Sequence, residues 1–229
     1  MLPIGNTRTG RLQNSQEAMA NHRDHNRRIP RADTSQLPSP RERILAAARD
    51  LFYRHGVHTV GVELIAEAAH TNKMTLYRHF KSKDELVLAY VRELADEGDA
   101  VWASLMARHP DAPAARLNAW VDHVEEILTN RFERGCAFAN AAVELQPDHP
   151  ARAVIESYKR RKREQLVRLF EDARYTTPEA LADEVFLLFE GARISLQCGA
   201  RGPASRVVTM LRDLLARAPR TPAPTPEPA

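Results

Sequence analysis

Apolar residues recur at helical spacing along nearly the whole chain between residues 39 and 217, and this pattern constrains the fold more than any other feature. Between Ile44 and Phe52 the apolar positions follow the order i, i+1, i+4, i+7 and i+8, which places them on one face of a helix. No alternating apolar and polar stretch bounded by hairpin turns appears in the sequence. The sequence therefore predicts an all-α fold.

Proline, glycine and small polar residues mark where the predicted helices begin and end. The first helix begins at Ser39 and Pro40, because serine caps a helix N-terminus and proline is tolerated in the first turn. Gly56 ends this helix with a left-handed cap, and Ser82 with Glu85 predicts a capping box for a longer helix. Further helices are expected over residues 62–69, 73–80, 82–108, 136–145, 150–175, 178–198 and 203–217, with another that begins at Pro113.

Two of the predicted helices have the lengths and spacing of a helix-turn-helix. Each contains about two turns, and the turn between them runs from His70 to Asn72. Ala66 and Ala69 are small enough to let the two helices approach closely. Gly61, which precedes the first of them, is a weak N-cap because it has no side chain to accept a hydrogen bond.

Positive charge is concentrated in the N-terminal part of the chain. Residues 1–83 contain 14 Lys and Arg against 7 Asp and Glu, whereas the remaining residues contain 19 against 23. Clustered positive charge favours nucleic-acid binding, because cations that neutralise phosphates release condensed counterions. The basic run at residues 159–163 is interpreted instead as a solvated helix face.

Other features favour a cytoplasmic protein without a metal or cofactor. The chain has no run of about 18 apolar residues, and its polar N-terminus lacks the apolar segment of a signal peptide. Cys136 and Cys198 lack metal-ligand spacing and are expected to be reduced thiols. His55 and His58 are spaced like metal ligands, but nothing nearby completes a site, so we expect them at the surface.

A long ordered set of residues surrounds the predicted helix-turn-helix, between Arg41 and Tyr90. It consists of Ile44-Leu45-Ala46-Ala47-Ala48, Leu51-Phe52, Gly56, Val60-Gly61-Val62, Ile65-Ala66, Ala69 and Thr75-Leu76-Tyr77-Arg78-His79-Phe80-Lys81-Ser82-Lys83-Asp84-Glu85-Leu86. This set resembles the N-terminal signature of the TetR/AcrR repressors. A second set, Gly135-Cys136, Asn140 and Glu144-Leu145-Gln146-Pro147-Asp148-His149-Pro150, resembles one branch of the C-terminal domains of the same family.

The resemblance implies a three-helix DNA-binding domain over residues 39–83 and a helical regulatory and dimerisation domain over residues 84–217. A disordered basic arm over residues 1–38 and a disordered, Pro-rich tail over residues 218–229 are expected to flank them.

The resemblance also implies a homodimer in which the helices over residues 178–198 and 203–217 pair with their symmetry mates. The first of these helices is apolar nearly all round, and such a helix must be covered on two sides. It therefore needs both a core and a partner.

The second short helix is expected to enter the major groove of double-stranded DNA, as in similar proteins. Lys73 can donate to guanine or to a phosphate, and Thr75 can contact a base edge. His70 occupies a turn position that is often glycine in this family, so we expect a strained, left-handed residue there. The DNA contacts carried over by position are Thr71, Asn72, Lys73, Thr75, Tyr77 and His79, with Arg78 beside them and Lys83 at a phosphate.

The resemblance further implies an apolar pocket inside the C-terminal helices. A small apolar or amphipathic ligand that prefers another dimer spacing would release a repressor from a palindromic operator by linkage. The candidate lining residues, each equally compatible with plain core, are Trp102, Met106, Trp120, His123, Val124, Phe138, Asn140, Phe186, Phe189 and Arg193.

Two other functions stay open. One is a constitutive or protein-controlled DNA-binding regulator without a small-molecule ligand. The other is an all-α enzyme with its acid and base hidden in the helical domain, although no nucleophile elbow, phosphate-binding loop or metal-ligand helix appears. Operator affinity in the presence of a ligand distinguishes a ligand-controlled repressor from a constitutive binder, and ligand turnover would indicate an enzyme.

Overall fold

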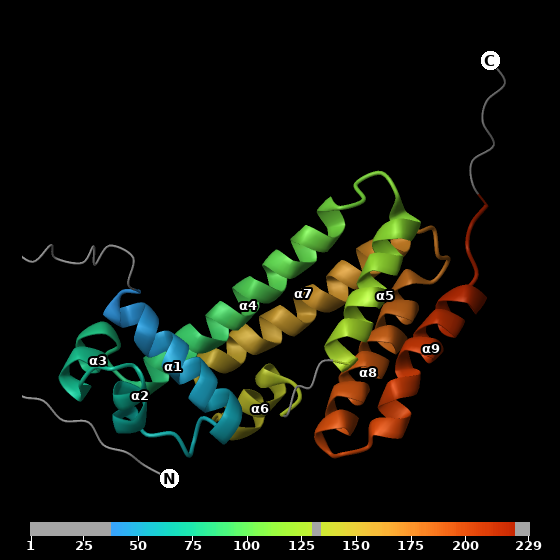
Figure 1. Cartoon of the computed structure of the whole chain (residues 1–229). Helices are drawn as coiled ribbons and strands as arrows, with labels where there is room; N and C mark the ends of the chain where they lie inside the picture. The colour runs from blue at the N-terminus through green and yellow to red at the C-terminus, as the bar shows by residue number, and fades with distance from the viewer. Residues whose placement is uncertain (1–37, 130–133, 223–229) are drawn as a thin grey trace, which may run out of the picture. The chain divides into compact units, whose positions relative to one another are not determined.

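The structure is a computed structural model that describes residues 38–129 and 134–222. These residues form α1 (Pro40–His55), α2 (Val62–Ala68), α3 (Lys73–His79), α4 (Lys83–Ala107), α5 (Pro113–Thr129), α6 (Ala137–Glu144), α7 (Pro150–Asp172), α8 (Pro178–Gln197) and α9 (Arg201–Arg217) (Figure 1). The described residues contain no strand, only an isolated β-bridge, so the predicted all-α fold is confirmed. None of the described helices is long and apolar enough to cross a membrane.

The ends of α1 follow directly from its sequence. The Ser39 hydroxyl accepts a hydrogen bond from the Glu42 backbone N–H at 3.3 Å, and the Glu42 carboxylate accepts one from the Ser39 N–H at 2.7 Å. This is a complete capping box, which satisfies two N–H groups at the helix N-terminus. Gly56 ends the helix with a φ of 89°, a value that favours glycine. Both predicted ends of this helix are confirmed.

Two predictions, the capping box of α4 and the start of α9, need correction. At α4, the Ser82 hydroxyl accepts from the Glu85 N–H at 3.0 Å as expected, but the Glu85 carboxylate accepts from the Lys81 N–H at 2.8 Å. The capping box is therefore incomplete, because the carboxylate satisfies an N–H one residue further out. The last helix, α9, begins at Arg201 rather than Pro203. Proline is tolerated in the first turn, where its missing N–H would have no partner within the helix.

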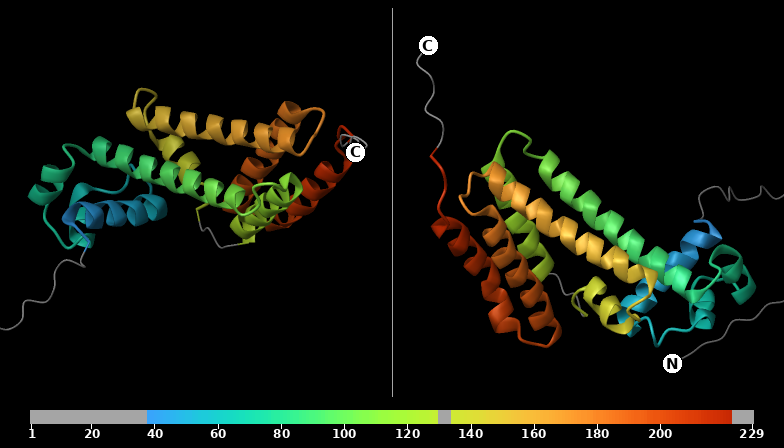
Figure 2. Two further views of the ribbon diagram at one scale, coloured as in Figure 1. Left: turned by 90° about the horizontal axis from the view of Figure 1, so that it is seen from above. Right: turned by 180° about the vertical axis from the view of Figure 1, so that it is seen from behind.

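The helices form two groups that two long helices connect. α1, α2 and α3 lie together, and α5, α8 and α9 lie together away from them (Figure 1). α4 and α7 lie side by side and extend from one group to the other in each view (Figure 2). α8 and α9 pack against each other as an antiparallel pair. Residues of α4 and α7 therefore pack against both groups.

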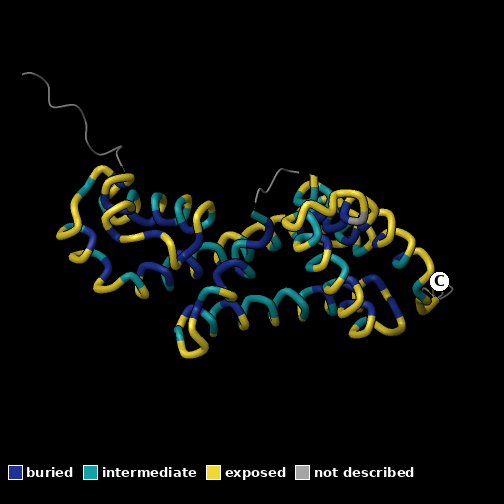
Figure 3. Tube along the Cα trace, turned by 90° about the horizontal axis from the view of Figure 1, so that it is seen from below, coloured by how far each residue is buried: buried dark blue, intermediate teal, exposed yellow. Residues whose placement is uncertain are grey.

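Buried apolar side chains form two clusters. Figure 3 marks the buried residues in dark blue along the chain. The first cluster joins α1–α3 with the first half of α4, with α6 and with the start of α7. Phe52 of α1 and Tyr90 of α4 meet in this cluster, with ring centroids 5.5 Å apart. The second cluster joins α5, the end of α7, α8 and α9. The apolar packing continues across residue 83, and the domain boundary placed there stays a prediction.

Residues 218–222 are held in place, although the sequence analysis assigned them to a disordered tail. The Thr176 N–H donates to the Pro219 carbonyl at 3.0 Å, and the Thr221 N–H donates to the Arg174 carbonyl at 2.9 Å. The Arg220 guanidinium lies 4.3 Å from the centre of the Tyr175 ring. The expectation of disorder is wrong for these five residues, because a buried tyrosine offers a surface for them. Residues 1–37 of the predicted arm over residues 1–38, and the rest of the tail, lie outside the described residues.

Candidate nucleic-acid interface and interior cavity

The turn between α2 and α3 has the conformation that its sequence predicts. His70 has a φ of 50°, the left-handed value expected for a position that is often glycine. The Thr71 N–H donates to the Ala66 carbonyl at 2.9 Å, and the His70 N–H donates to the Glu67 carbonyl at 3.0 Å. These bonds fix the turn and offset a conformational cost of about 1 kcal/mol or more for a non-glycine residue. Gly61 precedes α2 without a side-chain cap, as predicted.

α3 has one buried face and one exposed face. Leu76 is fully buried, and Phe80, just beyond the helix, is almost fully buried. Thr71, Thr75, His79 and Lys83 are half-buried, whereas Asn72, Lys73, Tyr77 and Arg78 are exposed. The structure thus brings all eight predicted DNA-contact residues together on α3 and the segments that flank it.

Met74 is an exposed residue on α3 that the sequence analysis did not single out. Its side chain is 80% exposed, and it lies on the helix face that also carries Tyr77 and Arg78. Single exposed apolar side chains are common on protein surfaces, so its exposure alone assigns it no role. Its spacing of three residues from Tyr77 and four from Arg78 was the available signal that it shares their helix face.

Lys73 is already engaged within the helix-turn-helix. Its ammonium donates to the Glu63 carboxylate of α2 at 2.5 Å and lies 5.9 Å from the centre of the Tyr77 ring. The hydrogen bond to Glu63 raises the pKa of Lys73 and lowers the pKa of Glu63. A phosphate or base that binds Lys73 must therefore compete with a carboxylate.

Two other predicted contact residues are turned toward the protein. The Nε2 atom of His79 is buried and has no hydrogen-bond partner among the described residues. The Lys83 ammonium donates to the His58 carbonyl at 3.4 Å. The Nε2 atom of His79 is therefore not exposed to solvent in this conformation.

Two arginines of α1 position the helix-turn-helix, a role that the charge count did not reveal. Arg43 donates through Nε to the Ala69 carbonyl at 3.2 Å and through Nη1 to the Pro38 carbonyl at 2.9 Å. The Arg41 guanidinium lies 5.0 Å from the centre of the Phe80 ring. Part of the N-terminal positive charge therefore stabilises the fold itself.

Asn72 is the N-cap of α3, and its removal has a predictable cost. Its side-chain oxygen accepts from the Thr75 N–H at 2.8 Å. We expect Asn72→Ala to lower the free energy of unfolding by about 1 kcal/mol, because the Thr75 N–H loses its partner. Asn72→Ser, which keeps a capping oxygen, should lower the free energy of unfolding by only a few tenths of a kcal/mol. Urea unfolding of the two variants at equal concentration measures the difference, and equal losses would contradict this role.

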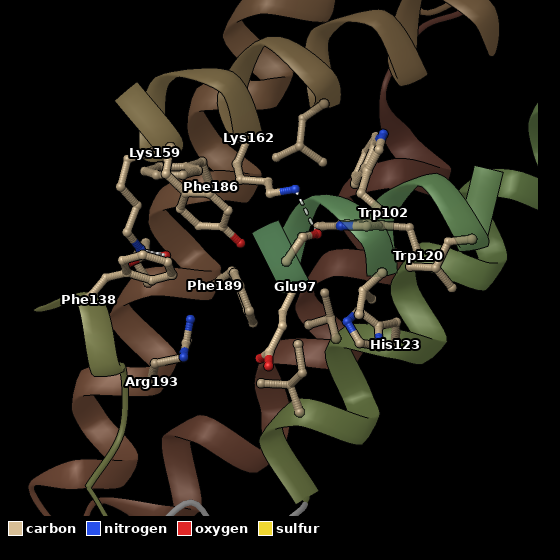
Figure 4. Close-up of a pocket in the computed structure, with 18 of the residues that line it drawn as sticks. Glu97, Trp102, Trp120, His123, Phe138, Lys159, Lys162, Phe186, Phe189 and Arg193 are labelled. Atoms are coloured by element: carbon tan, nitrogen blue, oxygen red, sulfur yellow. Dashed lines mark hydrogen bonds and ion pairs between the residues drawn. The ribbon is translucent and has the colours of Figure 1, made fainter. Parts of the chain in front are cut away.

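A cavity of about 320 Å³ lies among α4, α5, α6, α7 and α8 (Figure 4). The predicted residues that line it are Trp102, Trp120, His123, Val124, Phe138, Phe186, Phe189 and Arg193. The remaining two predictions, Met106 and Asn140, need correction. Met106 packs against the second buried cluster. The Asn140 side chain donates to the Arg134 carbonyl at 2.6 Å and accepts from Gln197 at 2.9 Å, so a structural role uses its polar atoms.

The cavity is more polar than predicted, because charged side chains of α4, α7 and α8 line it. These are Glu97, Lys159, Lys162, Glu190 and Arg193, of which only Arg193 was predicted. Lys159 pairs with Glu190 at 2.6 Å, and Lys162 pairs with Asp99 at 2.8 Å. Burial lowers the pKa of Lys162, and the Asp99 carboxylate opposes this effect.

The interpretation of residues 159–163 as a solvated face holds for Arg160 but is wrong for Lys159 and Lys162, which line the cavity. Arg161 pairs with Asp99 at 2.9 Å, and Arg163 pairs with Asp183. α7 packs between α4 and α8, so its cations reach carboxylates on both neighbours. The sequence of α7 alone could not predict that these carboxylates, on α4 and α8, lie next to its cations.

Two polar contacts connect helices of the cavity to α1 and to the loop that follows it. The Arg49 guanidinium of α1 binds both oxygens of Glu97, with Nη2 at 2.6 Å from Oε2. At the end of α6, the Glu144 carboxylate accepts from the His58 N–H at 2.7 Å. Glu97 is therefore both a cavity residue and a partner of α1.

Comparison with known proteins agrees with this geometry. The profile of bacterial regulatory proteins of the tetR family matches residues 44–90, which span α1 to the first part of α4. The crystal structure of a TetR transcriptional regulator from Streptomyces avermitilis is 31% identical, with a TM-score of 0.66 over 80% of this chain and 100% of that one. The chain belongs to the TetR family.

Further relatives of this TetR-family protein are also regulators. A TetR-family transcriptional regulator from Streptomyces coelicolor is 25% identical, with a TM-score of 0.72 over 78% of this chain and 95% of that one. The transcriptional regulator AcuR of Cereibacter sphaeroides is 29% identical over 65% of this chain and 72% of its own length. RutR of Escherichia coli is 36% identical over 37% of this chain and 39% of its own length. The protein is a DNA-binding transcriptional regulator of a family whose members bind DNA as dimers.

Proposed function

We propose that this TetR-family regulator is a homodimeric repressor that leaves a palindromic operator when a small amphipathic molecule fills the cavity. The observation that carries the proposal is the double role of Glu97, which lines the cavity and binds Arg49 of α1. A molecule that moves Glu97 or α4 changes the support of the helix-turn-helix. Binding at the cavity and binding to DNA are then linked through one contact.

The proposed DNA contact is the exposed face of α3. Lys73, Tyr77 and Arg78 project from it, with Thr71, Asn72, Thr75 and His79 beside them and Lys83 behind. When DNA arrives, a phosphate or guanine takes the place of Glu63 as the partner of Lys73. Glu63 thus holds Lys73 in the free protein and disfavours binding to weaker anions.

The proposed dimer interface is an apolar face on α8 and α9. Leu187 is 69% exposed, and Ile194 and Met210 are about half exposed. Leu187 and Met210 line a groove between α8 and α9, together with the small residues Gly191 and Ala204. Small residues let helices approach closely, and a twofold axis would bring this face against its own copy. The two α3 helices of such a dimer would need to lie about 34 Å apart to enter successive major grooves.

The operator is to be found by selecting bound sequences from random DNA and by footprinting. We expect a pseudo-palindromic site, an affinity that falls about 1,000-fold between 50 and 200 mM salt, and lower output of a reporter controlled by that site. Lys73→Ala and Tyr77→Phe should each weaken binding. Arg160→Ala is the matched control, because Arg160 is exposed on α7 away from α3. Absence of a protected site, or unchanged affinity in both α3 variants, would contradict the proposal.

A further inference from the structure

The charged residues that line the cavity are paired unevenly. Its two carboxylates already have cationic partners, since Glu97 binds Arg49 and Glu190 binds Lys159. The Lys162 ammonium binds Asp99. Burial lowers the pKa of His123, so its imidazole is neutral at pH 7. Among the charged residues that line the cavity, Arg193 is the one that these pairs do not include.

Arg193 forms no ion pair within the described residues. Its guanidinium lies 5.4 Å from the centre of the Phe189 ring, and its side chain is half-buried in the cavity wall (Figure 4). An arginine next to an aromatic ring presents a planar set of donors that fits a carboxylate. A cation in a partly apolar cavity lacks some of its hydration, which strengthens its attraction for an anion.

The hydroxyl of Tyr158 is a second donor in the cavity. Its ring stacks on Phe138 with centroids 4.4 Å apart, and Lys162 lies 5.0 Å from the ring centre. The hydroxyl lies close against Gly98, where a Cβ atom would be 2.1 Å from it. Burial raises the pKa of Tyr158 to about 12, and the charge of nearby Arg193 lowers it. The hydroxyl is therefore neutral, able to donate, and within the field of Arg193.

The other walls of the cavity are apolar. They are formed by Trp102, Leu105, Trp120, Val124, Ile127 and Leu166. Each buried methylene group of a ligand contributes about 0.8 kcal/mol on such a surface. A ligand that contacts both the Arg193 and Tyr158 donors and these apolar walls has an anionic head and an apolar body.

We propose that the cavity binds a small amphipathic carboxylate, whose head Arg193 and Tyr158 bind and whose apolar body contacts Trp102 and Trp120. This inference rests on the proposed function and specifies the ligand class. A cationic ligand would have to break the Glu97–Arg49 or Glu190–Lys159 pair, whereas an anion finds Arg193 without such a competitor. The lining thus selects against amines as well as for acids.

The two tryptophans make this inference testable without a label. The chain contains only Trp102 and Trp120, and both line the cavity. Octanoate, octanol and octylamine do not absorb where tryptophan does, and they differ only in the head group. We expect octanoate to change the emission with an apparent Kd at least about tenfold lower than that of octanol, and octylamine to bind most weakly.

Variants separate recognition of the head group from general packing. Arg193→Gln should weaken octanoate about tenfold or more while octanol binding stays the same, and Arg193→Lys should recover part of the loss. Tyr158→Phe should weaken octanoate by a smaller factor. Arg160→Gln, on the exposed side of α7, is the matched control. Unchanged octanol binding also shows that each variant keeps its folded cavity.

Three results would overturn the inference. The first is that octanol binds as tightly as octanoate, and the second is that octylamine binds most tightly. The third is that none of the three compounds changes the tryptophan emission at concentrations up to about 1 mM. Equal octanoate binding by Arg193→Gln and the original protein would exclude the assigned head-group contact. Operator binding measured on the same preparation reports separately on the proposed regulator, so its failure and the failure of the ligand class are distinguishable.

Discussion

Replacing Leu187 by aspartate is expected to convert the proposed dimer into monomers and to lower operator affinity by at least about 100-fold. Leu187 is the most exposed large apolar residue of α8 and lies in the groove between α8 and α9. Around a twofold axis, one substitution places two carboxylates at the same interface, and buried charges without partners cost several kcal/mol. A monomer contacts only one half-site and loses the gain from binding both. Sedimentation gives the mass, and gel-shift titration gives the affinity.

The control for this variant is Val143→Asp on α6. Val143 is 85% exposed, yet it lies away from the α8 and α9 face. The Val143→Asp substitution should leave both the mass of the dimer and its operator affinity unchanged. This result would exclude a general effect of added surface charge. A Leu187→Asp protein that stays dimeric would show that the interface lies elsewhere.

Replacing Leu76 by alanine is expected to lower the free energy of unfolding by about 2–5 kcal/mol. Leu76 is fully buried on the inner face of α3, so truncation removes packing and leaves a cavity behind. Met74, two residues earlier, is 80% exposed, and Met74→Ala should cost about 0.5 kcal/mol or less. Urea unfolding at one fixed protein concentration compares the two, because concentration affects the stability of a dimer. A larger loss for Met74→Ala would mean that α3 presents its opposite face to the core.

Features that depend on neighbouring residues in the sequence could be predicted. The Ser39 N-cap, the positive φ of Gly56 and the left-handed His70 each follow from the residue type and its immediate context. The burial of Ile65 and Leu76 follows from helical spacing. Local steric and hydrogen-bonding preferences decide these features, so one sequence is sufficient to find them.

Features that depend on distant partners could not be predicted. The sequence of α7 shows Lys162 and Arg161 but not that Asp99 of α4 faces them. Asn140 resembles a pocket residue until Gln197 is found 2.9 Å away. The aromatic walls of the cavity were predicted because apolar helix faces turn inward whichever helices cover them. Its polar wall was missed because a charge is recognised as buried only when its partner is known.

In the proposed mechanism, the Glu97–Arg49 contact has a consequence for the promoter as well as for the protein. Thermodynamic coupling is reciprocal, so an effector that weakens operator binding by some factor is itself bound more weakly, by the same factor, to the DNA-bound regulator. Regulator free of DNA then captures the effector first, and occupied operators respond last. The number of operators in a cell, relative to the number of regulator molecules, would therefore set the effector concentration at which transcription begins.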